Sequence, residues 1–129
     1  MSADLNDRFA KLNKFKVLSR SEGLAEVGAC PDVTALNGAD VVHGGYLFAL
    51  ADYALALASN TDDRLALSAS ATISYLLPCS IGDPLTARAE CIAKTERGGM
   101  YDVFIRGKSG KTYAVFHARA AYKPIKRES

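Results

Sequence analysis

The chain has 129 residues, with 16 Lys and Arg against 14 Asp and Glu and a formal charge of +2. This length and an apolar fraction of 49% are typical of one soluble globular domain, which we expect over residues 1–129. The near balance of charge argues against nucleic acid as a partner, because neutralising phosphates requires a concentrated basic face. A domain this small has little surface for a deep private pocket, so we expect a second subunit to help build any active site.

The cysteines and the apolar segments indicate the compartment. Three cysteines occur, an odd number without a CxxC pair: Cys30, Cys79 and Cys91. Neither a disulfide framework nor a zinc knuckle is indicated, which favours a reducing cytoplasm. Residues 1–15 lack the apolar core of a secretory signal. The longest apolar stretch, 46–58, is interrupted by Asp52 and is shorter than the roughly 20 residues of a membrane span, so no membrane association is expected.

Periodicity and turn residues predict a mixed α+β domain. In chain order we expect a short helix over 4–12, strands over 15–19 and 24–30, a loop over 37–45, a long helix over 46–60, and strands over 65–77, 85–94, 100–106 and 112–122. Sequential strands joined by short turns should pair antiparallel. In the strand over 65–77, apolar residues at the odd positions predict a single apolar face. The glycines at 98 and 99 are interpreted as a turn.

The long helix is apolar nearly all round, which is typical of a helix that is covered on most sides. One antiparallel sheet covers only one side of it, so the pattern predicts a dimer. Two sheets can pack face to face or pair edge to edge, and both arrangements remain open.

Asp52 is a carboxylate in the middle of this apolar helix, where a lone charge costs several kcal/mol unless it is paired or solvated. One interpretation is structural, in which Asp52 caps a nearby loop or forms a salt bridge to a basic residue such as Arg88 or Arg64. The other is catalytic, because small residues on the same helical face leave room for water or substrate.

The segment before the helix favours the catalytic interpretation. His43, Gly44 and Gly45 stand at the expected helix N-terminus, where free N–H groups and the positive end of the helix dipole gather. Glycines let a substrate carbonyl approach the backbone, and N–H groups pointing at it stabilise an oxyanion. Asp52, two turns further on, is expected to face the same cavity, which suits attack of water on an acyl carbonyl. A plain tight turn also explains a Gly pair.

The sequence LNGADVVHGGYLFALADYALALASN resembles the signature of the hotdog-fold thioesterases, in particular their PaaI-like branch of the phenylacetic acid degradation type. There an Asn precedes an HGG turn and an acidic residue follows at a fixed place. The likeness extends from about Phe15 onward. It implies an antiparallel sheet wrapped around a long central helix, a homodimer and often a homotetramer, and hydrolysis of acyl-coenzyme A thioesters with aryl or medium-chain acyl groups.

The resemblance also implies roles for individual residues. Asp52 falls at the catalytic carboxylate, as general base or nucleophile, and Gly44 at the residue whose N–H polarises the thioester carbonyl. Asn37 and His43 match polar residues that help to place substrate and water. Gly45 and Tyr53 lie beside the expected pocket, although the branch commonly has Thr where this chain has Tyr53. The family builds its site across the dimer interface.

Arg97, beside the glycines at 98 and 99, is the preferred candidate for binding the phosphates of coenzyme A. Nucleotide-binding and HExxH motifs are absent from the sequence, and neither a metal nor a cofactor is expected. Two other functions stay open: a non-catalytic acyl-coenzyme A binding module, and a hydratase or dehydratase on the same fold that pairs His43 with a carboxylate.

Overall fold

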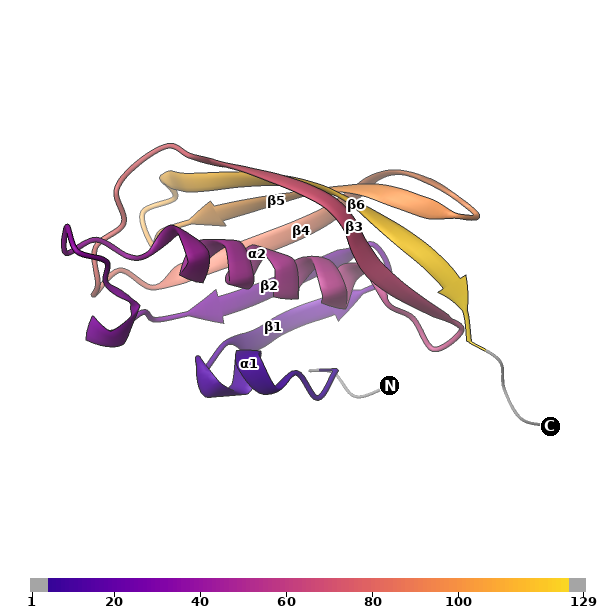
Figure 1. The fold of residues 1–129 in the computed structure, drawn as a ribbon, viewed down its shortest axis with the longest axis horizontal. Coiled ribbons are helices and arrows are strands. Elements are labelled where there is room, and N and C mark those ends of the chain that lie inside the picture. Colours follow the sequence, from indigo (N-terminus) through magenta and orange to yellow (C-terminus); the bar gives the residue numbers. More distant parts are fainter. Residues whose placement is uncertain (1–4, 126–129) are drawn as a thin grey trace.

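The structure is a computed structural model that describes residues 5–125. Its elements are α1 (Arg8–Leu12), β1 (Lys16–Ser21), β2 (Leu24–Ala29), the 3-10 turn η1 (Val33–Ala35), α2 (Gly44–Ser59), β3 (Arg64–Tyr75), β4 (Leu85–Thr95), β5 (Gly98–Arg106) and β6 (Thr112–Pro124). The six strands form one antiparallel sheet in the order β1-β2-β4-β5-β6-β3, and the sheet curves around α2 (Figure 1). The expected α+β fold is confirmed. Among residues 5–125, no helix has both the length and the apolar character needed to span a membrane.

The helix α2 supplies the centre of the core. Leu50, Ala54 and Leu57 are fully buried, and the helix packs on β2, β4, β3 and β5. One stripe of α2 is less covered, and it consists of Gly45, Phe48, Ala49, Asp52 and Ala56. The sheet of one protomer therefore leaves a side of this apolar helix without full cover, as the composition predicted.

The start of α2 lies two residues earlier than expected, at Gly44, because His43 caps the helix. At the other end two arginines bind carbonyl oxygens that the helix leaves unpaired. Nε of Arg20 donates to the carbonyl of Leu57 at 2.9 Å, and Nε of Arg64 donates to the carbonyl of Ser59 at 3.1 Å. Both ends of the helix are thus fixed by side chains.

The opening helix is shorter than predicted. Leu5 and Asn6 have φ angles of 55° and 52°, in the left-handed region, so the helix does not extend through them. Asp7 is the N-cap, and α1 begins at Arg8. Residue 4, where the helix was expected to begin, lies outside the described residues.

The strand order corrects the expectation that each strand pairs with the next. β3 pairs with β6, whereas β4 lies between β2 and β5. Residues 76–84 contain two prolines and form no tight hairpin, so the chain crosses the end of the sheet before β4 begins. β3 therefore becomes an edge strand.

The single apolar face predicted for β3 is also wrong. The register with β6 shifts between Ser68 and Ser70, which marks a β-bulge, and a bulge exchanges the two faces of a strand. Ala66 is buried before the bulge, whereas Leu65 and Leu67 are 41% and 57% exposed. The edge strand thus presents leucines to the surface.

The glycines at 98 and 99 lie inside β5 rather than in a turn. A Cβ atom on Gly98 would lie 2.6 Å from the carbonyl oxygen of Ala120, and one on Gly99 would overlap the hydroxyl of Tyr122. These glycines are required by the close approach of β6, not by a chain reversal.

Candidate active site

The amide groups at the N-terminus of α2 are almost all occupied. Nδ1 of His43 accepts a hydrogen bond from the N–H of Gly45 at 2.9 Å, which leaves Nε2 as the ring nitrogen that faces other partners. The carbonyl of His43 accepts from the N–H groups of Tyr46 and Leu47 at 3.0 and 3.3 Å. Among residues 5–125, the N–H of Gly44 has no acceptor, so it is the one amide of the first turn that is available to a ligand.

A cavity of about 380 Å³ lies beside this amide. It is lined by Asn37, Val41, Val42, Gly44, Leu47, Tyr75, Leu76, Leu77, Pro78 and Cys79. One wall carries the polar groups of Asn37 and Gly44, and the other consists of the apolar segment 75–77 at the end of β3. A cavity with hydrogen-bond donors at Gly44 and Asn37 and an apolar wall suits a polar carbonyl joined to an apolar chain.

Asn37 holds the loop that forms the polar wall. Its Oδ1 accepts hydrogen bonds from the N–H groups of Ala39 and Val41 at 2.8 and 3.3 Å. In the described part of the chain its amide nitrogen donates to no acceptor. The oxygen of Asn37 is therefore structural, and the NH₂ group is the part that remains for a ligand.

Asp52 is half-buried on the less covered stripe of α2. Burial raises the pKa of its carboxyl above the ordinary value, and the negative charge of Asp7 raises that pKa further. Across residues 5–125 its carboxylate forms no hydrogen bond or ion pair. A half-buried acid with a raised pKa and no structural partner is a candidate catalytic group.

The salt bridge considered for Asp52 is absent from the described residues. Arg64 pairs with Glu22 at 3.4 Å, and Arg88 pairs with Glu26 at 2.6 Å. Both arginines considered as partners of Asp52 are thus engaged with glutamates of the β1–β2 hairpin, and neither forms the salt bridge considered for this carboxylate.

Within one protomer, Asp52 does not line the cavity beside Gly44, contrary to the expectation that both face it. The two residues stand eight positions apart on α2, a separation of about 12 Å along the helix axis. The structure thus brings Asn37 and Gly44 together and leaves Asp52 on a separate surface of the same helix.

The other predicted residues are placed as follows. The N–H of Gly45 is taken by His43, so it is not free for substrate. Tyr53 is buried, with its ring 6.2 Å from that of Phe15 between centroids. Neither Gly45 nor Tyr53 lines the cavity beside Gly44.

Arg97 is exposed in the turn between β4 and β5, at the end of the sheet opposite Gly44. The N–H of Cys91 donates to the carbonyl of Gly23, and the N–H of Gly23 donates to that of Ala58, at 2.8 Å each. These bonds place this end of β4 beside the C-terminus of α2. Within one protomer, Arg97 is therefore remote from the free amide.

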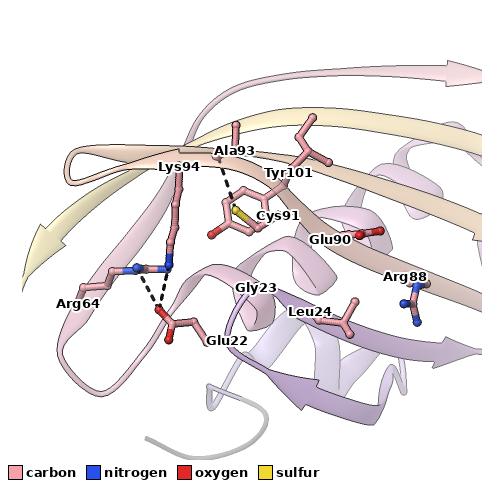
Figure 2. A pocket seen from close by; sticks show the side chains of 11 residues that line it. Glu22, Gly23, Leu24, Arg64, Arg88, Glu90, Cys91, Ala93, Lys94 and Tyr101 are labelled. Carbon is pink, nitrogen blue, oxygen red and sulfur yellow. Dashed lines mark hydrogen bonds and ion pairs between the residues drawn. The ribbon is translucent and has the colours of Figure 1, made fainter.

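A second cavity, of about 420 Å³, lies at this opposite end of the molecule (Figure 2). Glu22 bridges Arg64 and Lys94 across its mouth, with N···O distances of 3.4 and 3.6 Å. None of the predicted site residues lines it. Arg64 and Lys94 thus share one carboxylate of the same chain as their ion-pair partner.

A histidine–carboxylate pair exists elsewhere in the fold. Nδ1 of His117 lies 2.5 Å from Oδ1 of Asp102, and the His117 side chain is 49% exposed. The two residues face outward from β6 and β5, away from the cavity beside Gly44. Because Nδ1 of His43 faces Gly45, no histidine–carboxylate pair adjoins this cavity within residues 5–125, and nothing in the structure favours the hydratase alternative.

Sequence reasoning missed one residue of this site. The hydroxyl of Tyr75 donates a hydrogen bond to the carbonyl of Gly44 at 2.9 Å, and its ring lines the cavity. The two residues are 31 positions apart, so no local motif indicates their contact.

Comparison with known proteins places the chain in a family. The thioesterase superfamily profile matches residues 39–114, which include the free amide, Asp52 and the strands β3, β4 and β5. The chain belongs to this superfamily, and its architecture is the hotdog fold.

Two named relatives share most of their length with the chain. It is 37% identical to the acyl-coenzyme A thioesterase PaaI of Escherichia coli over 115 residues, which cover 89% of this chain and 82% of that protein. It is 34% identical to a putative esterase of Archaeoglobus fulgidus over 110 residues, covering 85% and 71%.

Solved structures agree with the fold. The E. coli PaaI protein from the phenylacetic acid degradation operon superposes with a TM-score of 0.88 and 36% identity, covering 95% of this chain and 87% of that one. A mutant of the phenylacetic acid degradation protein PaaI from Thermus thermophilus superposes with a TM-score of 0.85 and 34% identity, covering 89% and 98%.

Proposed function

We propose that the protein is an enzyme that hydrolyses acyl-coenzyme A thioesters to the free acid and coenzyme A. The observation that carries this proposal is the N–H of Gly44, which is free beside a cavity with an apolar wall. Membership of the thioesterase superfamily and the name of the E. coli relative support it. A fixed N–H donor aimed at a thioester oxygen stabilises the negative charge that develops during attack.

Asp52 is the group that we propose for activating the attack. As a general base it takes a proton from water, the hydroxide adds to the thioester carbon, the C–S bond breaks, and the proton passes to the coenzyme A sulfur. As a nucleophile its carboxylate adds to the thioester carbon and the C–S bond breaks, so that coenzyme A leaves as a thiolate. Water then cleaves the mixed anhydride, which gives the free acid, restores the carboxylate and supplies the proton for the thiolate. Asn37 and His43 support the site, with the NH₂ of Asn37 available to substrate and His43 fixing the helix start.

We further propose that the functional unit is a homodimer in which Asp52 of one protomer serves the cavity of the other. Three observations support it: the less covered stripe of α2, the separation of Asp52 from the cavity of its own protomer, and the unpaired edge β3 with exposed Leu65 and Leu67. Exposed apolar edge strands readily pair with another chain. Pairing two β3 edges antiparallel sets the Tyr75 end of one beside the Arg64 end of the other. Association of two dimers into a tetramer is what the family resemblance implies.

The free state of all three cysteines fits a reducing compartment, and the cytoplasm is the location that we propose. The domain is proposed to span residues 1–129.

A panel of aryl, short-chain and medium-chain acyl-coenzyme A substrates tests the proposed activity. Wild-type protein should hydrolyse at least one class, and Asp52→Asn and Asp52→Ala should lower turnover by about 10²–10⁴-fold while the fold is retained. Asp102→Asn, which changes a carboxylate on the outer face of β5, is the matched control and should keep wild-type turnover. Binding of the panel without turnover by the wild type would instead identify a binding module.

A further inference from the structure

The first turn of α2 begins on residues that form helices poorly. Gly44 and Gly45 follow one another, and glycine loses more backbone freedom in a helix than any other residue. A helix that starts on two glycines frays unless other groups hold it. A frayed first turn would leave the free N–H of Gly44 without a fixed direction.

Besides the helix's own bonds from the N–H groups of Tyr46 and Leu47 to the carbonyl of His43, three hydrogen bonds hold this turn. The N–H of His43 donates to the carbonyl of Ala35 at 2.7 Å, and the N–H of Gly45 donates to Nδ1 of His43 at 2.9 Å. The third bond, from the hydroxyl of Tyr75 to the carbonyl of Gly44 at 2.9 Å, comes from the end of β3. Of the three, this third bond is the one that ties the glycine turn to the sheet.

The ring of Tyr75 also packs closely against residue 44. A Cβ atom at Gly44 would lie 2.9 Å from both Cζ and Oη of Tyr75, closer than side-chain carbon atoms approach one another. A side chain at position 44 would therefore have to displace the end of the Tyr75 ring, including the hydroxyl that binds the Gly44 carbonyl. Tyr75 is 51% exposed, so its outer flank remains available as a wall of the cavity.

We propose that Tyr75 is a positioning residue for thioester hydrolysis: its hydroxyl holds the carbonyl of Gly44, so that the N–H of the same residue keeps a fixed direction toward the substrate carbonyl oxygen. This inference rests on the proposed function. The Gly44 carbonyl belongs to the peptide that follows the Cα atom and the N–H to the peptide that precedes it, so holding the carbonyl limits rotation about ψ of Gly44 between these two peptides. Such preorganisation acts on the transition state more than on substrate binding.

Tyr75→Phe removes only the hydroxyl and tests the proposal directly. We expect kcat to fall about three- to tenfold with KM changed by less than about twofold, because the hydrogen bond to the backbone carbonyl of Gly44 is lost. Tyr122→Phe is the matched control, since its hydroxyl contacts that of Tyr101 at 2.5 Å, remote from Gly44. A Tyr75→Phe protein with wild-type kcat, or an equal loss in Tyr122→Phe, would overturn the proposal.

A second measurement does not depend on turnover. In ¹H–¹⁵N spectra the amide signals of Gly44 and Gly45 should move in Tyr75→Phe and stay in place in Tyr122→Phe. Unmoved signals in Tyr75→Phe would overturn the positioning role whatever the kinetics show. If the wild type hydrolyses no thioester, the proposed function fails, and the amide signals still decide whether Tyr75 holds Gly44.

Discussion

His43 and Gly45 form the N-terminal cap of α2, with Nδ1 of the imidazole 2.9 Å from the backbone N–H of the glycine. A ring nitrogen that accepts this bond cannot accept a proton from substrate or water at the same time. Nδ1 of His43 therefore has a structural role as the cap of α2, and Nε2 is the ring nitrogen that can contact substrate.

Two substitutions at His43 distinguish its role as the N-cap of α2 from a role of its imidazole in the reaction. His43→Ala should lower the free energy of unfolding by about 1 kcal/mol, the usual effect of losing a helix cap. His43→Asn supplies another capping oxygen and should restore most of that stability together with turnover. Urea denaturation and the thioesterase assay measure both quantities. A folded His43→Asn protein without turnover would show instead that the imidazole takes part in the chemistry.

The raised pKa of Asp52 predicts the acidic limb of the pH–rate profile. A base must be ionised, so kcat/KM should fall as pH decreases through the pKa of Asp52, at a higher pH than for an ordinary aspartate. Asp7→Asn removes one of the two causes of the shift while keeping an N-cap oxygen for α1. The limb should then move to lower pH. A limb that does not move would indicate that another group controls it.

The same shift predicts that Asp52 destabilises the fold at neutral pH. Because the folded state holds the proton more tightly than the unfolded state, stability falls as pH rises from the unfolded pKa through the raised folded one. Asp52→Asn cannot ionise, so it should be more stable than the wild type at pH 7 and equal to it below the unfolded pKa. Thermal melts across this pH range measure the difference. Equal wild-type and variant stability at every pH would argue against a raised pKa.

The edge proposed for the dimer is tested with two exposed leucines. Leu67 on β3 is 57% exposed and Leu18 on the opposite edge strand β1 is 56% exposed, so Arg at either position costs a protomer little. Leu67→Arg should dissociate the dimer. It should also abolish turnover, because Asp52 then no longer lies beside the Gly44 cavity of the other protomer. Leu18→Arg should do neither. Light scattering after gel filtration gives the mass, and a dimeric Leu67→Arg protein would exclude the β3 edge.

The close contact of β5 with β6 predicts a large effect from a small substitution. Gly98→Ala places a methyl group against the backbone of Ala120, and it should destabilise the protein by about 1–3 kcal/mol. Gly38→Ala, in the loop before α2, meets nothing within 4 Å and is the matched control. Chemical denaturation compares them. Equal free energies of unfolding for the two variants would mean that β6 moves to accommodate the methyl group without loss of stability.

The parts of the fold that depend on short-range patterns could be predicted from the sequence. The long apolar helix, the six strands and the proximity of Asn37 to Gly44 all follow from residues near each other in the chain. The same holds for the fold class, because the central motif is local.

Long-range relationships could not be predicted. The pairing of β3 with β6 and the bulge near Ser70 depend on which strands meet after the chain crosses the sheet. The contact between Tyr75 and Gly44 follows from that crossing. The distance of Asp52 from the cavity depends on how much of α2 the sheet leaves uncovered, which the helical pattern alone does not determine.

The crossing of the chain also sets an order of assembly. Among the strands of residues 5–125, β3 pairs with β6 alone, which follows it by some fifty residues. During synthesis β3 therefore has no strand to pair with until β6 has been made. Tyr75, at the end of β3, is placed by the same late event. A nascent or truncated chain that lacks β6 therefore has neither the β3 edge proposed for the dimer nor the hydrogen bond from Tyr75 to the carbonyl of Gly44. We therefore expect the proposed activity only after the whole domain has folded.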